Sequence, residues 1–379
     1  MILNLPANID LAYCQNVHPS QNWDEMQQSV FQFAPAVREA ISPGDKSRFG
    51  IGLRLSNEAV EEVTQAQLLS FADQLAEQNL YSFTMNAFPF GNFCKPPVKQ
   101  KVYQPAWWEP ARVRYTCKVA RVLAELLPAD KNGTISTVPI GYKFPAPVSG
   151  QLQTAVQNIK NVAHFLADLF EETGKKILLG LEPEPDCVLG STDEFIKFYQ
   201  QYFFSDQACC EFVGICFDTS HQAVEFENIS QSLRKIVDAK IPVSKIQISS
   251  ALQFSPDEIS LKQSADFCEP VFLHQTKLRK KTGGIISFAD LDDALVYSDF
   301  APDDLVRVHF HTPVFADEIA GLKTTRDLLL GDFADLIKKG VCEHLEIETY
   351  TWGHFASEQD LVFGIANEYR WVLEKMFAD

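Results

Sequence analysis

The run ILLGLEPEPD, residues 177–186, is the most informative stretch of this 379-residue chain. Five apolar or small residues end abruptly at Glu182, and Pro183 and Pro185 then restrict the backbone that follows. A short apolar run bounded by such residues is typical of a strand that is buried on both faces of a parallel sheet. The run therefore predicts a strand at Ile177–Glu182 with acidic side chains at its carboxyl end.

Seven further runs of this kind alternate with longer stretches of helical periodicity. We expect eight strands, at Asn8–Tyr13, Phe49–Leu55, Tyr81–Asn86, Thr134–Pro139, Ile177–Glu182, Val213–Asp218, Lys245–Ser249 and Leu345–Thr349. Between them, Gln151–Phe170 has apolar residues at spacings of three and four, and Ser191 with Glu194 forms a capping box that starts a helix. This alternation predicts an α/β protein, a (β/α)8 TIM barrel, although an open doubly wound sheet shares the pattern.

Two segments do not fit the repeat. One is the proline-rich loop Ala87–Ala106, and the other is a long excursion, 251–322, that carries a strand-like run at Leu305–His311. Long excursions in compact domains are usually functional loops or lids. We expect a single domain over 1–379, with 251–322 as a lid-like insertion between the seventh and eighth strands.

Composition narrows the classes of partner. The formal charge of −17 disfavours nucleic acid, whose phosphates are also negative. The amino terminus has no basic region of a signal peptide, and no run approaches the roughly 20 apolar residues that span a bilayer. We therefore expect a cytoplasmic protein without a membrane span that binds a small molecule; the oligomeric state is left open.

The sixth strand, FVGICFDTSH at 212–221, places Asp218 at its carboxyl end and His221 three residues later. A carboxylate and a neutral imidazole together suit transition metals such as Zn²⁺, Mn²⁺, Co²⁺ or Fe²⁺ better than Ca²⁺. Taken alone, the D-x-x-H spacing is equally typical of a helix cap. For the acidic residues Glu182 and Glu184 after the fifth strand, the alternative interpretation is a solvated loop.

The eighth strand and the excursion add further polar side chains. In HLEIETYTW, 344–352, Glu346 and Glu348 share one face of the strand because side chains alternate. In VRVHFHTPVF, 306–315, the same alternation puts Arg307, His309 and His311 on one side, where two histidines could share a metal or bracket an anionic group. Half-exposed histidines on an excursion strand are the alternative. Residues at other strand ends and in the excursion could complete a polar pocket: His18, Asn86 and His274.

Together these motifs resemble a known group of barrels. LEPE on the fifth strand, FDTSH on the sixth and IET on the eighth resemble the metal-binding pattern of the xylose isomerase-like TIM barrel superfamily, which includes sugar isomerases, sugar epimerases and endonuclease IV. Over nearly the whole chain, including RFGIGLRLS, FLHQT, VHFHTPVF and LEIETYTW, the sequence is most similar to the EboE-type metabolite traffic proteins.

The resemblance implies a divalent metal site, with Mn²⁺, Zn²⁺, Co²⁺, Fe²⁺ or Mg²⁺ as the ion. It implies that Glu182 and Glu348 ligate the metal from opposite sides of the barrel and act as the catalytic pair, with Asp218 as a third ligand. His221 resembles either a second-metal ligand or a substrate-binding residue. Where the superfamily has a histidine on the seventh strand, KIQISS has Gln247, so we expect His309 or His311 to complete the site.

The leading hypothesis is a metal-dependent isomerase or epimerase acting on a small polyhydroxylated or phosphorylated carbonyl compound, within a pathway that processes or exports metabolites. We expect His311 among the metal ligands, and the residues expected at the substrate are His18, Asn86, Glu184, Gln247, His274, Arg307, His309 and Glu346. Two alternatives stay open: a metabolite-binding or carrier protein without turnover, favoured by Gln247, and an endonuclease IV-like phosphodiesterase, favoured by the D-x-x-H pair.

Overall fold

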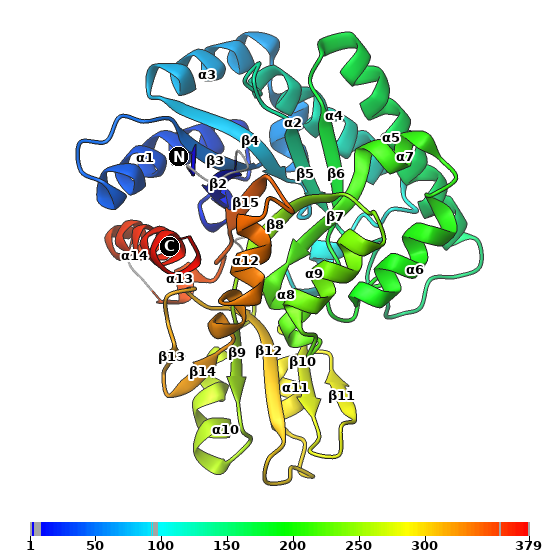
Figure 1. Ribbon diagram of the computed structural model, residues 1–379, viewed down its shortest axis with the longest axis vertical. Coiled ribbons are helices and arrows are strands. Elements are labelled where there is room, and N and C mark those ends of the chain that lie inside the picture. Colours follow the sequence, from blue (N-terminus) through cyan, green and yellow to red (C-terminus); the bar gives the residue numbers. More distant parts are fainter. Residues whose placement is uncertain (1, 4–8, 92, 94–97, 356–357, 378–379) are drawn as a thin grey trace.

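The computed structural model describes residues 2–3, 9–91, 93, 98–355 and 358–377 of the chain. Its main feature is a ring of eight parallel strands with helices outside (Figure 1). In chain order these strands are β2 (Ile9–Tyr13), β3 (Phe49–Arg54), β4 (Leu80–Asn86), β5 (Gly133–Thr137), β6 (Ile177–Leu181), β7 (Val213–Asp218), β8 (Val243–Ile248) and β15 (His344–Ile347). A two-residue strand, β1 (Ile2–Leu3), pairs antiparallel with β2.

The strands form a nearly closed barrel. Hydrogen-bonded neighbours run in the order β2, β15, β8, β7, β6, β5, β4 and β3, and an isolated parallel bridge between Cys14 and Gly52 connects the two ends of this series. A parallel sheet whose ends meet has no free edge, which distinguishes it from an open doubly wound sheet. The (β/α)8 TIM barrel expected from the sequence is therefore confirmed.

Helices surround the barrel and cover its apolar outer surface (Figure 1). They are α1 (Trp23–Ile41), α2 (Asn57–Glu62), α3 (Gln65–Glu77), α4 (Pro110–Leu126), α5 (Gln151–Thr173), α6 (Thr192–Tyr202), α7 (Gln207–Phe212), α8 (Thr219–Val224), α9 (Ile229–Asp238), α12 (Asp332–Lys338), α13 (Trp352–Phe355) and α14 (Glu358–Trp371). Ser191 caps α6 in a capping box with Glu194, as its spacing predicts. No helix within the described part of the chain has the length and apolar character that a membrane crossing requires.

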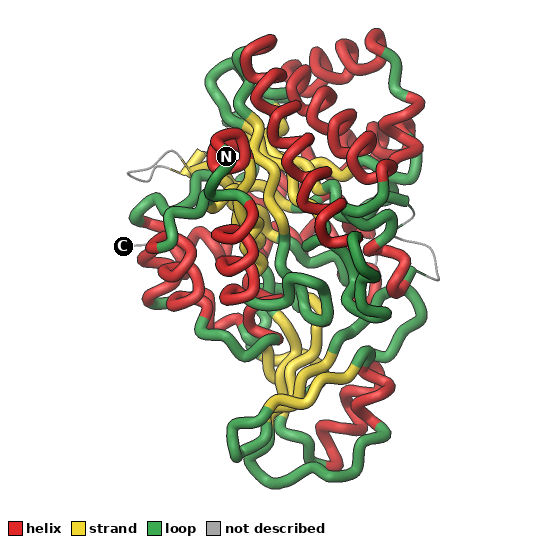
Figure 2. The backbone as a smooth tube through the Cα atoms, turned by 90° about the vertical axis from the view of Figure 1, so that its right-hand side faces the viewer, coloured by secondary structure: helices red, strands yellow, loops and turns green. Residues whose placement is uncertain are grey.

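All eight expected strands are found within two residues of their predicted bounds, except that Asn8, the expected start of the first, lies outside the described residues. The prediction for 251–322 was incomplete, because this insertion forms a second sheet below the barrel in Figure 2. Its strands are β9 (Ala251–Phe254), β10 (Thr276–Arg279), β11 (Ile285–Phe288), β12 (Leu305–His311), β13 (Glu318–Ile319) and β14 (Leu322–Thr324), and its helices are α10 (Glu258–Ser264) and α11 (Leu291–Leu295).

The second sheet is antiparallel, in the order β11, β10, β12, β9, β14 and β13. It has a small apolar core of its own, which includes Leu252, Leu278, Val306 and Phe310. β12 follows Leu305–His311 as expected and ends beside the carboxyl ends of the barrel strands, where His311 contacts the barrel. The insertion therefore delivers side chains to the barrel mouth from a hydrogen-bonded sheet.

The barrel interior contains a buried ion pair below the mouth. Lys245 on β8 binds Glu346 on β15, and both side chains are almost fully inaccessible to solvent. Gly52 on β3 provides the space for this carboxylate, because a Cβ atom there would lie only 1.5 Å from Oε1 of Glu346. The alternation expected for the eighth strand thus places Glu346 inside the barrel, one layer below Glu348.

Candidate metal centre

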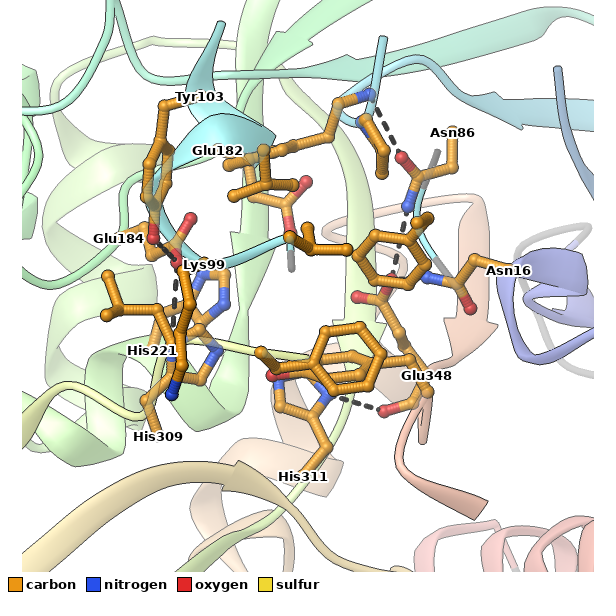
Figure 3. Close-up of a pocket in the computed structure, with 18 residues that line it drawn as sticks. Asn16, Asn86, Lys99, Tyr103, Glu182, Glu184, His221, His309, His311 and Glu348 are labelled. Carbon is orange, nitrogen blue, oxygen red and sulfur yellow. Dashed lines mark hydrogen bonds and ion pairs between the residues drawn. The ribbon is translucent and has the colours of Figure 1, made fainter. Parts of the chain in front are cut away.

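Three carboxylates meet at the carboxyl end of the barrel. Glu182 directly follows β6, Asp218 is the last residue of β7, and Glu348 directly follows β15. All three are at most 4% exposed. Because parallel strands end at the same edge of a barrel, side chains far apart in sequence converge there. Figure 3 shows Glu182 and Glu348 facing the same space.

Two amides fix the orientation of Glu348. Asn16, which follows β2, donates from Nδ2 to Oε1 of Glu348 over 2.7 Å, and Asn86 at the end of β4 donates to the same oxygen over 3.1 Å (Figure 3). Neither of these two hydrogen bonds involves Oε2 of Glu348. Asn86 was expected in the pocket, whereas Asn16 gave no signal in the sequence.

Three histidines lie on the other side of this space. His221 is in α8, directly after β7, while His309 and His311 come from β12 of the insertion. Nδ1 of each ring forms a hydrogen bond with a carbonyl oxygen. The partner of His221 is the backbone carbonyl of Pro183 at 3.0 Å, that of His309 is the side-chain carbonyl of Gln275 at 2.8 Å, and that of His311 is the backbone carbonyl of Glu348 at 2.8 Å.

A carbonyl oxygen only accepts hydrogen bonds, so each of these bonds places the ring proton on Nδ1 of the neutral imidazole and leaves a lone pair on Nε2. Metal-binding histidines in proteins are commonly oriented in this way, by a hydrogen bond from the ring nitrogen that does not bind the metal. The Nε2 atoms of His309 and His311 are buried and have no hydrogen-bond partner among the residues that the structure describes. The same is true of Oε2 of Glu182 and Oδ2 of Asp218.

The surroundings perturb the protonation of the carboxylates. Burial and the charges of Glu348 and Asp218 raise the pKa of Glu182 well above its usual value. Burial and the charges of Asp218 and Glu346 do the same for the pKa of Glu348. Burial also acts to raise the pKa of Asp218, but His221, His311 and hydrogen bonds outweigh it and lower that pKa. A cation among these groups would relieve the repulsion.

Burial lowers the pKa of His311 to about 4, and burial together with the neighbouring rings lowers that of His309 well below its usual value. Both imidazoles are therefore neutral near neutral pH, the form that ligates metals. Nitrogen of His311 lies 3.9 Å from an oxygen of Asp218, and nitrogen of His221 lies 3.8 Å from the same oxygen.

The donor atoms form three overlapping groups in which all ligand atoms lie within 4.8 Å of one another. The groups are Glu182, Asp218 and His221; Asp218, His311 and Glu348; and His221, His309 and His311. Buried oxygen and nitrogen atoms without hydrogen-bond partners are unfavourable in a protein core. At these separations they suit the coordination of a divalent transition metal or Mg²⁺. The residues present therefore suit the ion that the sequence motifs imply.

Apart from Asp218, which is fully buried behind them, the residues of these groups line a cavity at the barrel mouth. The cavity has about 510 Å³ of empty space including its opening. Seven of the residues expected at the site are part of its described lining: Asn86, Glu182, Glu184, His221, His309, His311 and Glu348. Asn16, which was not expected, lies beside them in the lining. Glu184 accepts a hydrogen bond from Tyr103, and Gln275 bridges Glu184 and His309. Burial raises the pKa of Glu184, although His221 opposes this change.

Other residues expected at the substrate lie outside the described lining of this cavity. Arg307 shares the face of His309 but donates to the Ala223 carbonyl and to Gln253 instead. His18 is buried with its ring stacked on Phe33 at 4.0 Å between centroids. A direct contact between these side chains and a ligand in the cavity is therefore not expected.

His274, Gln247 and Glu346 also lie away from the cavity lining. His274 is buried and positions the insertion, because Nδ1 contacts the His309 carbonyl and Nε2 contacts Glu269. Gln247 lies inside the barrel, in register with Asp218 on one side and Glu346 on the other. Strand alternation predicts the face that Gln247 and Glu346 share, but not their depth within the barrel.

The chain matches no protein-family model and no curated protein sequence. Solved structures similar to it include a xylose isomerase-like TIM barrel protein from Mycobacterium smegmatis in complex with magnesium, with a TM-score of 0.53 and 11% identity over 97% of this chain and 96% of that chain. A D-psicose 3-epimerase in the presence of D-fructose has a TM-score of 0.52 and 12% identity, over 98% and 100%.

The IOLI protein with a bound zinc atom is similar at a TM-score of 0.51 and 12% identity, over 98% of this chain and 100% of that chain. The structural neighbours are thus xylose isomerase-like TIM barrel proteins, and they include magnesium and zinc complexes. At these identities the likeness shows the fold, and the activity has to be argued from the site.

Proposed function

We propose that this chain is a divalent-metal-dependent isomerase or epimerase that acts on a small hydroxycarbonyl compound. The observation that carries the proposal is the convergence of Glu182, Glu348, His221 and His311 on a cavity at the barrel mouth, with the buried carboxylate of Asp218 within ligand distance of them. Barrel enzymes build their active sites at this face. His309, expected at the substrate, joins the other two histidines in one group of nitrogen donors and is proposed as a further ligand.

A divalent ion bound there would polarise the carbonyl oxygen of a substrate and make the adjacent C–H group more acidic. Glu182 and Glu348 extend from β6 and β15, so they approach a ligand in the cavity from different sides. A carboxylate held beside the reacting carbon can both accept and return a proton. We assign proton transfer at the carbon next to the carbonyl to these two glutamates, with Asn16 and Asn86 positioning Glu348.

The proposal is tested by proton exchange. Protein loaded with Mn²⁺ is incubated in D₂O with ketoses and other hydroxyketones, and NMR follows deuterium at the carbon next to the carbonyl. We expect Glu182→Gln and Glu348→Gln each to slow exchange by about 100-fold or more, the scale of general acid–base catalysis. Glu343→Gln, at an exposed residue before the amino end of β15, is the control. Exchange that persists in both site variants would contradict the assignment.

A binding or carrier protein on the same barrel is the second candidate. Gln247 favours it, because a neutral amide stands where the superfamily pattern has a histidine. Bound metal with no exchange on any hydroxyketone would support this candidate. The similarity to EboE-type metabolite traffic proteins, a role in metabolite export, and an endonuclease IV-like activity stay predictions from the sequence.

A further inference from the structure

The cavity at the barrel mouth has two chemically different ends. Its floor consists of the carboxylates, imidazoles and asparagines of the candidate metal centre. The rest of the described lining is mostly carbon. Beside Lys99 and Tyr103 it comprises Phe88, Pro89, Phe93, Val98, Val102, Phe272, Leu273 and the ring of Tyr350. A site for a chain of hydroxyl groups would need hydrogen-bonding partners along its length. This apolar part of the lining forms a wall that has few of them.

Three aromatic rings form the core of this wall, and they come from three distant segments. The Phe272 ring lies 5.0 Å from Phe93 and 4.7 Å from Tyr350, and Phe93 lies 5.6 Å from Tyr350, all between centroids. Tyr350 in turn lies 4.5 Å from the ring of His311. The edge and tilted contacts are those that aromatic groups prefer. The aromatic wall therefore begins next to the metal centre.

The two excursions meet above the cavity and hold this wall in place. The backbone N–H groups of Val98 and Lys99, in the proline-rich loop, donate to the Val271 carbonyl of the insertion over 3.2 and 2.7 Å. Lys99 also forms an ion pair of 2.7 Å with Asp290. Residues 92 and 94–97 of the loop lie outside the described part of the chain.

Lys99 is the one cation in the lining that the structure describes, and its charge is directed to Asp290. The hydroxyl of Tyr103 is also engaged, because it donates to Glu184 over 2.5 Å and accepts from Gln275 over 2.6 Å. Tightly bound phosphate usually requires several charged or backbone donors directed at its oxygens. The described wall therefore suits an uncharged apolar group better than a phosphate.

We propose that the substrate carries an aromatic ring next to its hydroxycarbonyl group. The ring would lie against Phe93, Phe272 and Tyr350 while the oxygen atoms face the carboxylates and imidazoles. This inference rests on the proposed function, since it assigns the hydroxycarbonyl end to the metal centre. It replaces the polyhydroxylated or phosphorylated compound that the sequence led us to expect.

The test compares two ligands that differ only in the group beside the ketone. Protein loaded with Mn²⁺ is titrated by calorimetry with 2-hydroxyacetophenone, which carries a phenyl ring, and with hydroxyacetone, which carries a methyl group. We expect the phenyl compound to bind more tightly by at least on the order of tenfold, about 1.4 kcal/mol, because a ring leaves water for an apolar wall. Dihydroxyacetone phosphate serves as the phosphorylated competitor.

Two variants locate the effect. Phe272→Ser, at a half-buried wall residue, is expected to remove most of the phenyl advantage. Phe363→Ala, at an exposed ring on α14 that is 54% accessible, should leave the advantage unchanged. Equal affinity for both ketones in the parent, or tighter binding of dihydroxyacetone phosphate, would overturn the inference. An advantage that survives Phe272→Ser would also overturn the assignment to this wall.

The outcome for the substrate class is separable from that for the proposed function. If Mn²⁺ binds and supports proton exchange on hydroxyketones without a phenyl advantage, only the substrate inference fails. If the phenyl advantage is seen and depends on Phe272, but is the same with chelator and no Mn²⁺ binds, the wall assignment holds and the metal-dependent function fails.

Discussion

In metal-free protein near neutral pH, Glu182→Gln is expected to increase the free energy of unfolding by about 1–3 kcal/mol, the scale of burying a carboxylate without a partner. Glu182 is buried beside Glu348 and Asp218, and one of its oxygens has no partner in the described structure. Folding therefore requires either an unfavourable charge or proton uptake. Glutamine has nearly the same shape and requires neither.

The sign of the pH dependence follows from proton binding. The folded-state pKa of Glu182 lies well above the usual value of 4.5, so over that interval the folded chain binds more protons than the unfolded chain. The contribution of this group is fully present below pH 4.5 and is lost as pH rises through the raised pKa. The metal-free parent should thus lose stability with rising pH across that window, and Glu182→Gln should lose less.

With saturating Mn²⁺ the same substitution is expected to have the opposite effect, because a bound cation stabilises the folded state and the variant binds it more weakly. Denaturant unfolding with chelator and with Mn²⁺ measures both signs. Glu343→Gln, at an exposed residue, should change neither. Destabilisation of equal size under both conditions would mean that Glu182 has a structural role unrelated to a cation.

Lys245→Met is expected to destabilise the protein by about 3–5 kcal/mol, the usual effect of leaving a buried charge without its partner. Lys245 and Glu346 are both 1% exposed or less, and they pair inside the barrel below the metal centre. Lys245 also acts to lower the pKa of Glu182 and of Glu348. Its loss should therefore weaken metal binding as well as folding.

The double variant Lys245→Met with Glu346→Leu separates these effects. Removing both charges leaves no unpaired group, so we expect most of the lost unfolding free energy to return, as measured in guanidinium chloride. Metal affinity should stay reduced, because the positive charge near the carboxylates is still absent. A double variant as unstable as the single one would show that packing around Lys245, and not the ion pair, dominates its contribution.

The barrel could be predicted because short strand-like runs alternate with helical stretches along the chain, and some of these runs are compact, apolar and end at a polar residue, as in Ile177–Glu182 and Val213–Asp218. The insertion could not be predicted as fully. β10 and β11 have four residues each and are joined by a turn at Gly283, so their local pattern is too short to stand out. β10 is held in the sheet by pairing with β12, which is a non-local interaction, and β11 pairs with β10.

The site residues that could be predicted are those whose place along a barrel strand follows from the sequence. Glu182, Asp218 and Glu348 end strands, and the barrel then brings them together. The contribution of His309 to the nitrogen group depends on how the second sheet docks, which no local pattern gives. Asn16 lies in a 3-10 helix after β2 and belongs to no motif, and Phe272 gives a signal only as part of FLHQT, so their places in the cavity follow only from the folded structure.

We propose above that the carboxylates and imidazoles at the barrel mouth hold a divalent ion. Metal analysis of the protein after dialysis against Mn²⁺ or Zn²⁺, beside the double variant Glu182→Gln and Glu348→Gln, tests it most directly. We expect at least one ion per parent chain and loss of that ion in the folded double variant. Equal metal content in the two proteins, or no metal in the parent, would contradict the account.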